Sequence, residues 1–231
     1  MKKTILITAA TSDLGSELAR HLDQQGHTLL LLDQEQLLLE SLDAQLNGDH
    51  TLIPFDIWAA DYTQYQTLAQ LIAEDYPALD GLIFTQMYVE NLRPIIHCDP
   101  ETWLKTLQIN LTSPLWFIQT LLPSLQASAQ PKILFTTHDQ HQQQPAYWHG
   151  FGVSQSALHT LITTLHNEHS TYDNLQISII DTGWIDTSFN RNIFPNAQPH
   201  WKQPTDILPL YEQALNEHQP STIKRYAYDH P

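Results

Sequence analysis

Side chains able to exchange protons gather in one short stretch of this sequence, between positions 138 and 149. His138 and Asp139 are adjacent, and His141, Tyr147 and His149 follow shortly after them. A histidine–aspartate pair can act as acid and base, because histidine titrates near neutrality. The chain contains 13 histidines, however, and a run of glutamines lies among these residues. We therefore expect a solvated polar loop here, with acid–base chemistry as the alternative.

The same histidines do not match a metal site. The spacing His138-x-x-His141 with a distant His149 fits no recognised zinc motif. Short histidine patterns also arise often by chance. We expect no bound metal, and a histidine metal site remains a distant third hypothesis for the chemistry of this chain.

The composition limits the partners of the chain. Its 231 residues include 10 Lys and Arg against 25 Asp and Glu, which gives a formal charge of −15. A field of this sign repels phosphate backbones and anionic lipids, so nucleic acid and membranes are not expected partners. The single cysteine, Cys98, excludes an internal disulfide and suits a reducing compartment. The apolar N-terminal run stops at Ser12, too early for a signal core, and we expect a cytoplasmic protein.

Apolar runs alternate along the chain with segments of helical period. This alternation is typical of βαβ units, in which helices cover a parallel sheet. We expect a single α/β domain spanning residues 1–231, a length that buries a substantial core. Helices are predicted over 103–125 and 151–169, and the proline-bearing stretch 190–204 is predicted to be irregular. The predicted strands are Thr4–Thr8, Thr28–Leu32, Thr51–Phe55, Gly81–Thr85, Lys132–Thr137, Leu175–Ile180 and Ile223–Tyr228.

The first strand leads through the turn Thr8-Ala-Ala-Thr-Ser-Asp-Leu-Gly15 into an amphipathic helix. A strand, a turn and a helix in this order form the pyrophosphate site of Rossmann-type folds. Asp13 lies at the helix start, and two unit charges about 4 Å apart repel by roughly 4 kcal/mol at an effective dielectric near 20. The simpler interpretation is that Ser12 or Asp13 caps the helix. Because a cap and a phosphate compete for the same amides, either interpretation weakens a dinucleotide site.

This turn and the order of elements resemble the short-chain dehydrogenase/reductase family. The family has Thr-Gly-x-x-x-Gly-x-Gly at the turn, where Thr8 and Gly15 match and Ala9 and Asp13 replace two glycines. The resemblance covers nearly the whole chain, as far as the helix start near Tyr211. It implies a Rossmann-type, doubly wound parallel sheet of about seven strands with helices on both faces. It also implies an oxidoreductase in which Thr8 and Gly15 contact a dinucleotide.

The resemblance places the four catalytic positions of the family at Asn110, His138, Phe151 and Gln155. The family has Asn, Ser, Tyr and Lys there; the Tyr exchanges a proton with the substrate oxygen, and the Lys lowers the pKa of that Tyr. Only Asn110 is retained. Phe151 has no hydroxyl and Gln155 no charge, whereas general acid catalysis contributes about 10²–10⁴-fold. Without its lysine partner, Asn110 is expected to be a helix-kink or buried hydrogen-bonding residue.

The resemblance also implies cofactor contacts. Asp33 matches the acidic residue that binds the ribose hydroxyls of NAD and disfavours NADP, and Asp56 matches an aspartate beside the adenine. Gly183 and Thr187 match a loop near the nicotinamide, which here lacks its proline. Met87 stands where the family has a glycine that admits the cofactor. We expect weak or undetectable NAD(H) binding and no NADP(H) binding; each aspartate is equally an ordinary strand-end residue.

Two functions are compatible with these residues. The first is a protein of this family that lacks standard dehydrogenase activity and has a binding, regulatory or scaffold role. The alternative is an NAD-dependent oxidoreductase with an altered active site around His138 and Tyr147. In the family, two helices equivalent to 103–125 and 151–169 form a dimer contact, and the first of these is apolar nearly all round. We therefore expect a homo-oligomer through these helices, a dimer or a tetramer.

Overall fold

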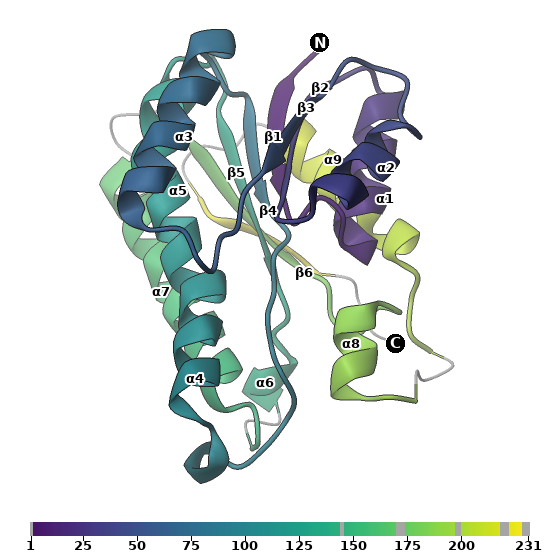
Figure 1. Cartoon of the computed structure of the whole chain (residues 1–231), viewed down its shortest axis with the longest axis vertical. Helices are drawn as coiled ribbons and strands as arrows, with labels where there is room; N and C mark the ends of the chain where they lie inside the picture. Colours follow the sequence, from purple (N-terminus) through teal and green to yellow (C-terminus); the bar gives the residue numbers. More distant parts are fainter. Residues whose placement is uncertain (1, 144–145, 170–173, 197–199, 218–221, 228–231) are drawn as a thin grey trace.

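The computed structural model describes residues 2–143, 146–169, 174–196, 200–217 and 222–227. At its centre is one parallel sheet of seven strands in the order β3-β2-β1-β4-β5-β6-β7 (Figure 1). This arrangement confirms the predicted fold class, and each strand lies close to its predicted ends; Tyr228 lies outside the described residues. The strands are β1 (Thr4–Thr8), β2 (Thr28–Asp33), β3 (Thr51–Pro54), β4 (Gly81–Phe84), β5 (Lys132–Thr137), β6 (Gln176–Asp181) and β7 (Lys224–Ala227).

Helices connect the strands. In the part of the chain that the structure describes, none of them is long and apolar enough to cross a membrane. The α-helices are α1 (Asp13–Gln24), α2 (Gln36–Asp43), α3 (Tyr62–Asp75), α4 (Pro100–Leu107), α5 (Ser113–Gln126), α6 (Gln140–Gln143), α7 (His149–His169), α8 (Ser188–Ile193) and α9 (Leu208–Asn216). Short 3₁₀ turns lie at Ile95–His97 and Pro204–Ile207.

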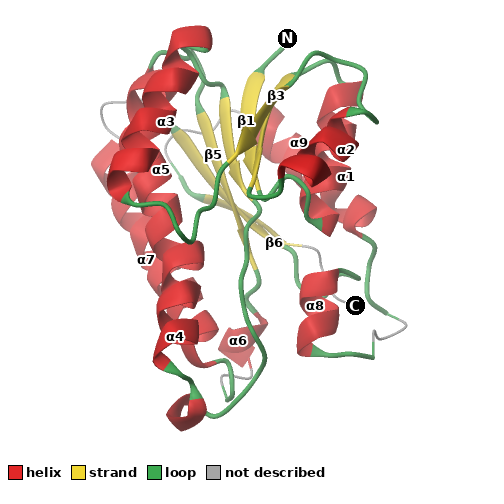
Figure 2. Ribbon diagram, viewed as in Figure 1, coloured by secondary structure: helices red, strands yellow, loops and turns green. Residues whose placement is uncertain are grey.

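The sheet is buried on both faces. Helices α1, α2 and α9 cover one face, and α3, α5 and α7 cover the other (Figures 1 and 2). Successive residues of a strand point to opposite faces, so Leu30 of β2 joins the core under α3, α5 and α7 while Leu31 joins the core under α1 and α9. This two-sided burial explains why the strands read as continuous apolar runs rather than as alternating ones.

The strand order reverses direction between β1 and β4. The chain first extends from β1 through β2 to β3, and then returns to pair β4 against the other side of β1. In open parallel sheets, the carboxyl ends of the strands at this switch point form a crevice in which ligands bind. The candidate site is therefore expected beyond Thr8 and Phe84.

The predicted helix over 103–125 is present, but it is interrupted. Helix α4 passes through a π-helical segment, Gln108–Thr112, into α5. Such π-turns are rare and often lie at functional sites. Asn110 lies in this segment, so the irregular hydrogen bonding falls on the asparagine that the sequence singled out.

The expectation of a solvated loop between positions 138 and 149 was wrong. In the stretch expected to be a solvated loop, His138, Asp139, His141 and His149 are all buried, and two short helical starts replace the loop. The polar composition is misleading because aromatic rings pack against His138, while Asp139 and His149 are paired with His159 and with the Asn91 carbonyl. The stretch 190–204 begins with the last residues of α8, and its described residues at 194–196 and 200–203 are irregular as predicted; residues 197–199 lie outside the described part of the chain.

Candidate functional site

The turn after β1 is built by backbone geometry that suits glycine. Ala9 has φ +47°, in the left-handed region, which costs an L-residue with a side chain about 1–2 kcal/mol. A Cβ on Gly15 would lie 2.2 Å from the Ala9 carbonyl oxygen. Ser12 caps α1, and its Oγ accepts a hydrogen bond of 3.0 Å from the Gly15 amide. Ser12 is thus one of the two caps that the sequence allowed.

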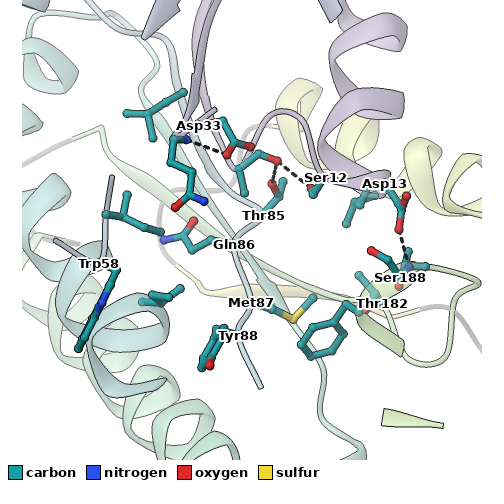
Figure 3. Close-up of a pocket in the computed structure, with 18 of the residues that line it drawn as sticks. Ser12, Asp13, Asp33, Trp58, Thr85, Gln86, Met87, Tyr88, Thr182 and Ser188 are labelled. Carbon is teal, nitrogen blue, oxygen red and sulfur yellow. Dashed lines mark hydrogen bonds between the residues drawn. The ribbon is translucent and has the colours of Figure 1, made fainter. Parts of the chain in front are cut away.

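The Asp13 side chain does not cap α1; it reaches a different helix. Its Oδ2 accepts a hydrogen bond of 2.5 Å from the backbone N–H of Ser188, at the start of α8 (Figure 3). Thr187 caps α8 through a 3.3 Å hydrogen bond from the Asn190 amide to its Oγ1. The carboxylate therefore joins the turn after β1 to the segment after β6, across the mouth of the crevice.

A cavity of about 210 Å³ lies at the switch point, beneath this contact. Ala9 follows β1, Asp33 ends β2, Asp56 follows β3, and residues 85–88 follow β4; all of them line the cavity. Small-molecule sites usually have volumes of about 300–1,000 Å³. The cavity is therefore suited to a small ligand rather than to an extended one.

The two strand-end aspartates are already engaged with backbone. Oδ2 of Asp33 accepts hydrogen bonds from the Thr11 amide at 3.0 Å and the Thr11 hydroxyl at 2.7 Å, and its Oδ1 accepts from the Gln34 amide at 2.8 Å. Oδ1 of Asp56 accepts from the amides of Trp58 at 2.9 Å and Ala59 at 3.1 Å. Asp33 therefore ties the end of β2 to the turn after β1, and Asp56 holds its own turn, while both line the cavity.

The segment after β4 contributes a residue that sequence reasoning did not single out. The Thr8 hydroxyl donates to the side-chain oxygen of Gln86, and the Thr85 hydroxyl donates to the Thr8 carbonyl at 2.5 Å. Gln86 is only 7% exposed, and among the described residues its amide nitrogen has no hydrogen-bond partner. Met87, next in the chain, also lines the cavity.

The structure brings the four family positions together beyond β4 and β5. Asn110 is buried; its Oδ1 accepts from the Tyr88 amide at 2.8 Å, and its Nδ2 donates to the Tyr88 carbonyl at 2.9 Å and to Ser154 Oγ at 3.1 Å. Ser154 in turn donates to the Phe151 carbonyl at 2.8 Å. Asn110 thus holds the segment after β4 against α7, in agreement with the structural role expected for it.

His138 and Phe151 lie in a packed aromatic cluster, which we define as His138, Trp148, Phe151, Trp184 and Phe189. His138 and Phe151 are both 0% exposed. The ring of Trp184 crosses that of His138 edge-on at 4.6 Å, and the rings of Trp148 and Phe189 lie 5.4 and 5.6 Å from that of Phe151. The sequence pattern did not reveal this cluster, because its members come from three separate segments.

The charge state of His138 follows from this burial. Complete desolvation lowers its pKa from 6.5 to about 4, although the nearby Asp181 carboxylate raises the pKa in part. Neither ring nitrogen has a hydrogen-bond partner among the described residues. Gln155, 1% exposed, accepts a 3.4 Å hydrogen bond from the His138 amide rather than from its ring. His138 is therefore a neutral core residue near pH 7.

The remaining candidates in this stretch do not join one site. Tyr147 is 60% exposed and has φ +74°, whereas His138 is sealed in the aromatic cluster. His149 Nε2 donates to the Asn91 carbonyl at 2.7 Å, and its Nδ1 lies 3.6 Å from Cys98 Sγ. In the described part of the chain, no three histidine, cysteine, aspartate or glutamate side chains are arranged to hold a metal.

Two further positions that match cofactor contacts of the family, Gly183 and Thr187, lie after β6. Gly183 has φ +53°, and its amide donates to Asp181 Oδ1 at 3.2 Å. Thr187 is buried as the cap of α8 and lines the cavity. Thr8 is fully buried between β1 and β4. Of the six positions expected to bind a cofactor, Thr8, Gly15, Asp33, Asp56, Gly183 and Thr187, each has an intramolecular structural role here.

A parallel sheet in this order, with a cavity at its switch point, defines a doubly wound domain of Rossmann type. Residues 3–198 match the family model of the short chain dehydrogenases. This chain belongs to that family.

Relatives and solved structures agree with this assignment. The chain is 28% identical over 214 residues to the uncharacterized oxidoreductase YciK of Escherichia coli K12, covering 90% of this chain and 84% of that protein. Its fold matches a short chain dehydrogenase of Salmonella enterica serovar Typhi CT18 with a TM-score of 0.90 at 24% identity, covering 98% and 96% of the two chains. A short chain dehydrogenase of Shigella flexneri 2a, solved in complex with NADP, matches with a TM-score of 0.89 at 25% identity, covering 97% and 96%.

The residues of this chain do not fit a complete dinucleotide. The Asp13 carboxylate holds the Ser188 amide across the mouth of the crevice, and the cavity beneath measures about 210 Å³. A pyrophosphate placed at the turn would meet this carboxylate, and the Gly15 amide at the start of α1 already donates to Ser12 Oγ. Opening the crevice for a dinucleotide would require breaking the contact between Asp13 and α8.

Proposed function

We propose that this chain is a short chain dehydrogenase family member without standard dehydrogenase activity, which retains a ligand-binding cavity. The observation that supports the proposal most directly is the aromatic cluster at the catalytic positions. Phe151 is fully buried there, beside His138, whose ring nitrogens have no partner among the described residues. No hydroxyl stands where carbonyl chemistry needs its proton donor. The role that remains is binding, regulatory or scaffolding.

The alternative function is an NAD-dependent oxidoreductase with an altered active site. The relative in Escherichia coli K12, an oxidoreductase by name, favours it. The two side chains that would carry this chemistry lie in different environments. His138 is fully buried, whereas Tyr147 is 60% exposed to solvent. Because proton transfer needs a donor within hydrogen-bond reach of the substrate, we favour the non-catalytic proposal.

Restoring the proton relay alone is expected not to restore turnover. The double variant Phe151→Tyr/Gln155→Lys regains a hydroxyl and a charge but keeps Ala9, Asp13 and Met87, and hydride transfer needs a bound nicotinamide. We expect no oxidation of NADH or NADPH, followed by nicotinamide absorbance, by the wild type or by the double variant against generic carbonyl substrates.

The single variant Phe151→Tyr serves as the folding control for this assay, and nicotinamide fluorescence measures binding separately. Clear NADH turnover by the double variant would show that the cofactor pocket is intact and that only the catalytic positions are impaired, and turnover by the wild type would contradict the proposal. Low-micromolar NADPH binding by the wild type would overturn the interpretation of both Asp33 and the turn at Asp13.

We also propose that the chain self-associates through α4, α5 and α7. Leu104 on α4 is 59% exposed and Val153 on α7 is 43% exposed, and closed two-fold dimers are the commonest soluble assembly. We expect a homodimer or a larger oligomer in light scattering at micromolar concentration without ligand. Leu104→Glu is expected to shift it toward the monomer, whereas Leu71→Glu, at a 57% exposed position on α3, is expected not to. A wild-type monomer would refute self-association.

A further inference from the structure

A serine and a histidine outside the positions considered so far face each other where α6 meets α7. The Ser156 hydroxyl of α7 lies 3.4 Å from Nε2 of His141 of α6. Nδ1 of the same ring lies 3.1 Å from the His138 carbonyl oxygen. Because a carbonyl oxygen only accepts hydrogen bonds, Nδ1 carries the ring proton, and Nε2 is left to accept from the hydroxyl. This order of hydroxyl, imidazole and orienting acceptor is the one that activates a serine nucleophile.

The pair is open to solvent on the side of the serine. Ser156 is exposed, whereas His141 is 5% exposed, so the nucleophile is accessible and the base is held in place. Both residues line a surface hollow of about 620 Å³, a volume usual for small-molecule sites. Gly152 also lines the hollow, and a Cβ on it would lie 3.6 Å from Cδ2 of His141. The missing side chain therefore leaves this edge of the imidazole uncovered.

A carboxylate near His141 favours a positive charge on its ring. Burial raises the pKa of Asp139, but a 2.9 Å hydrogen bond with His159 lowers it. The nearby charges of Arg225 and His141 lower it further, so the pKa of Asp139 lies below its usual value and the group is ionised at neutral pH. A base that takes a proton from serine becomes an imidazolium, which a neighbouring negative charge stabilises. The surroundings of His141 therefore favour proton transfer from Ser156.

The lining of the hollow indicates the kind of substrate. Among the described residues, no aspartate, glutamate, lysine or arginine lines it, although the chain has 25 acidic and 10 basic residues. Its large apolar side chains are Ile95, Trp148 and Val153. The amide of Gln142 and the hydroxyl of Tyr147 also line it, and such groups can donate to an oxygen that becomes negative during acyl transfer. An uncharged, apolar substrate suits this lining.

We propose that Ser156 and His141 form a hydrolytic site for small, uncharged esters with an apolar acyl or aryl group. His141 Nε2 takes the hydroxyl proton while Ser156 Oγ bonds to the carbonyl carbon of the ester. The bond from this carbon to the alcohol oxygen then breaks, and His141 returns the proton to the leaving alcohol. A water molecule, deprotonated by the same ring, releases the acyl group as a carboxylic acid and restores the serine. The reaction uses neither hydride nor dinucleotide, so it goes beyond the function proposed for the crevice and does not depend on it.

Hydrolysis of p-nitrophenyl butyrate, followed by nitrophenolate absorbance above the spontaneous rate, tests the proposal. The wild type is expected to turn this ester over. Ser156→Ala and His141→Gln should each lower kcat/KM by about 100-fold or more, since general base catalysis contributes about 10²–10⁴-fold. Ser41→Ala, at an exposed serine on α2, and His97→Gln, at an exposed histidine, are the matched controls. Both controls should retain the activity of the wild type.

A fluorophosphonate probe, which bonds covalently to an activated serine, identifies the nucleophile by peptide mass spectrometry. The adduct is expected on Ser156 in the wild type and to be lost in Ser156→Ala. Because Ser156 is exposed, this variant should fold normally, and it decides the question even if His141→Gln is unstable. No hydrolysis by the wild type, full activity in Ser156→Ala, or an adduct on another serine alone would each overturn the proposal. NADH oxidation is a separate assay, so its result decides the function proposed above and not this one.

Discussion

Replacing Phe151 with alanine is expected to lower the free energy of unfolding by about 3–5 kcal/mol, the range for deleting a buried aromatic side chain. Phe151 is fully buried and contacts the rings of Trp148 and Phe189, so its removal leaves a cavity lined by rigid rings. Chemical denaturation at pH 7 measures the change. The family has a proton-exchanging tyrosine at this position, whereas Phe151 packs in the core.

Leu38→Ala, at a 53% exposed position on α2, provides the control and should change the stability by no more than about 0.5 kcal/mol. If Phe151→Ala costs less than about 1 kcal/mol, the aromatic cluster is not the packed core described here. The space around Phe151 would then be available to a ligand.

The second large effect concerns acid. Replacing His138 with leucine is expected to remove a loss of stability that the wild type suffers below pH 6.5. Burial lowers the pKa of His138 from 6.5 to about 4, so the unfolded chain takes up a proton in this range and the folded chain does not. The stabilising contribution is complete above pH 6.5 and is lost as the pH falls toward 4. At 1.36 kcal/mol per pKa unit, the loss reaches about 3 kcal/mol.

Denaturation curves at pH 7 and pH 4.5 measure this difference. His97→Leu is the control, because His97 is exposed and its replacement should leave the slope unchanged. Equal pH dependence in wild type and His138→Leu would show that His138 becomes charged in the folded protein. Its unpartnered nitrogens would then need a partner that this structure does not show.

The sheet was predictable from sequence because its signals are local. Each apolar run, such as Leu29–Leu32, is long enough to be recognised without knowledge of its neighbours, and two-sided burial makes it continuous. The positions of Asn110, His138, Phe151 and Gln155 were predicted through the resemblance, and the structure places them together. The spacing of the family's catalytic residues was enough to locate these four positions.

The surroundings of these positions were not predictable from local pattern. His138 reads as a polar loop residue until Trp184, from the segment after β6, packs against it at 4.6 Å. The partner of Asp13 is Ser188, 175 positions away, and nothing near either residue indicates the other. The partner of Asn110 is likewise distant in sequence, since its side chain hydrogen-bonds to the backbone of Tyr88. Polarity by residue type therefore predicted exposure where long-range packing produced burial.

A glycine can occupy the turn after β1 for two reasons: the backbone geometry requires it, or a bound ligand does. At Gly15 a side chain would collide with the Ala9 carbonyl oxygen at 2.2 Å, so the chain cannot make this bend with any other residue there. At Ala9 the left-handed backbone is tolerated at a modest penalty. At Asp13, the first residue of α1, the backbone makes no such demand. Folding alone therefore requires a glycine at position 15, favours one mildly at position 9 and needs none at position 13. A glycine at position 15 reflects the backbone geometry, and only position 13 is free to respond to a bound phosphate.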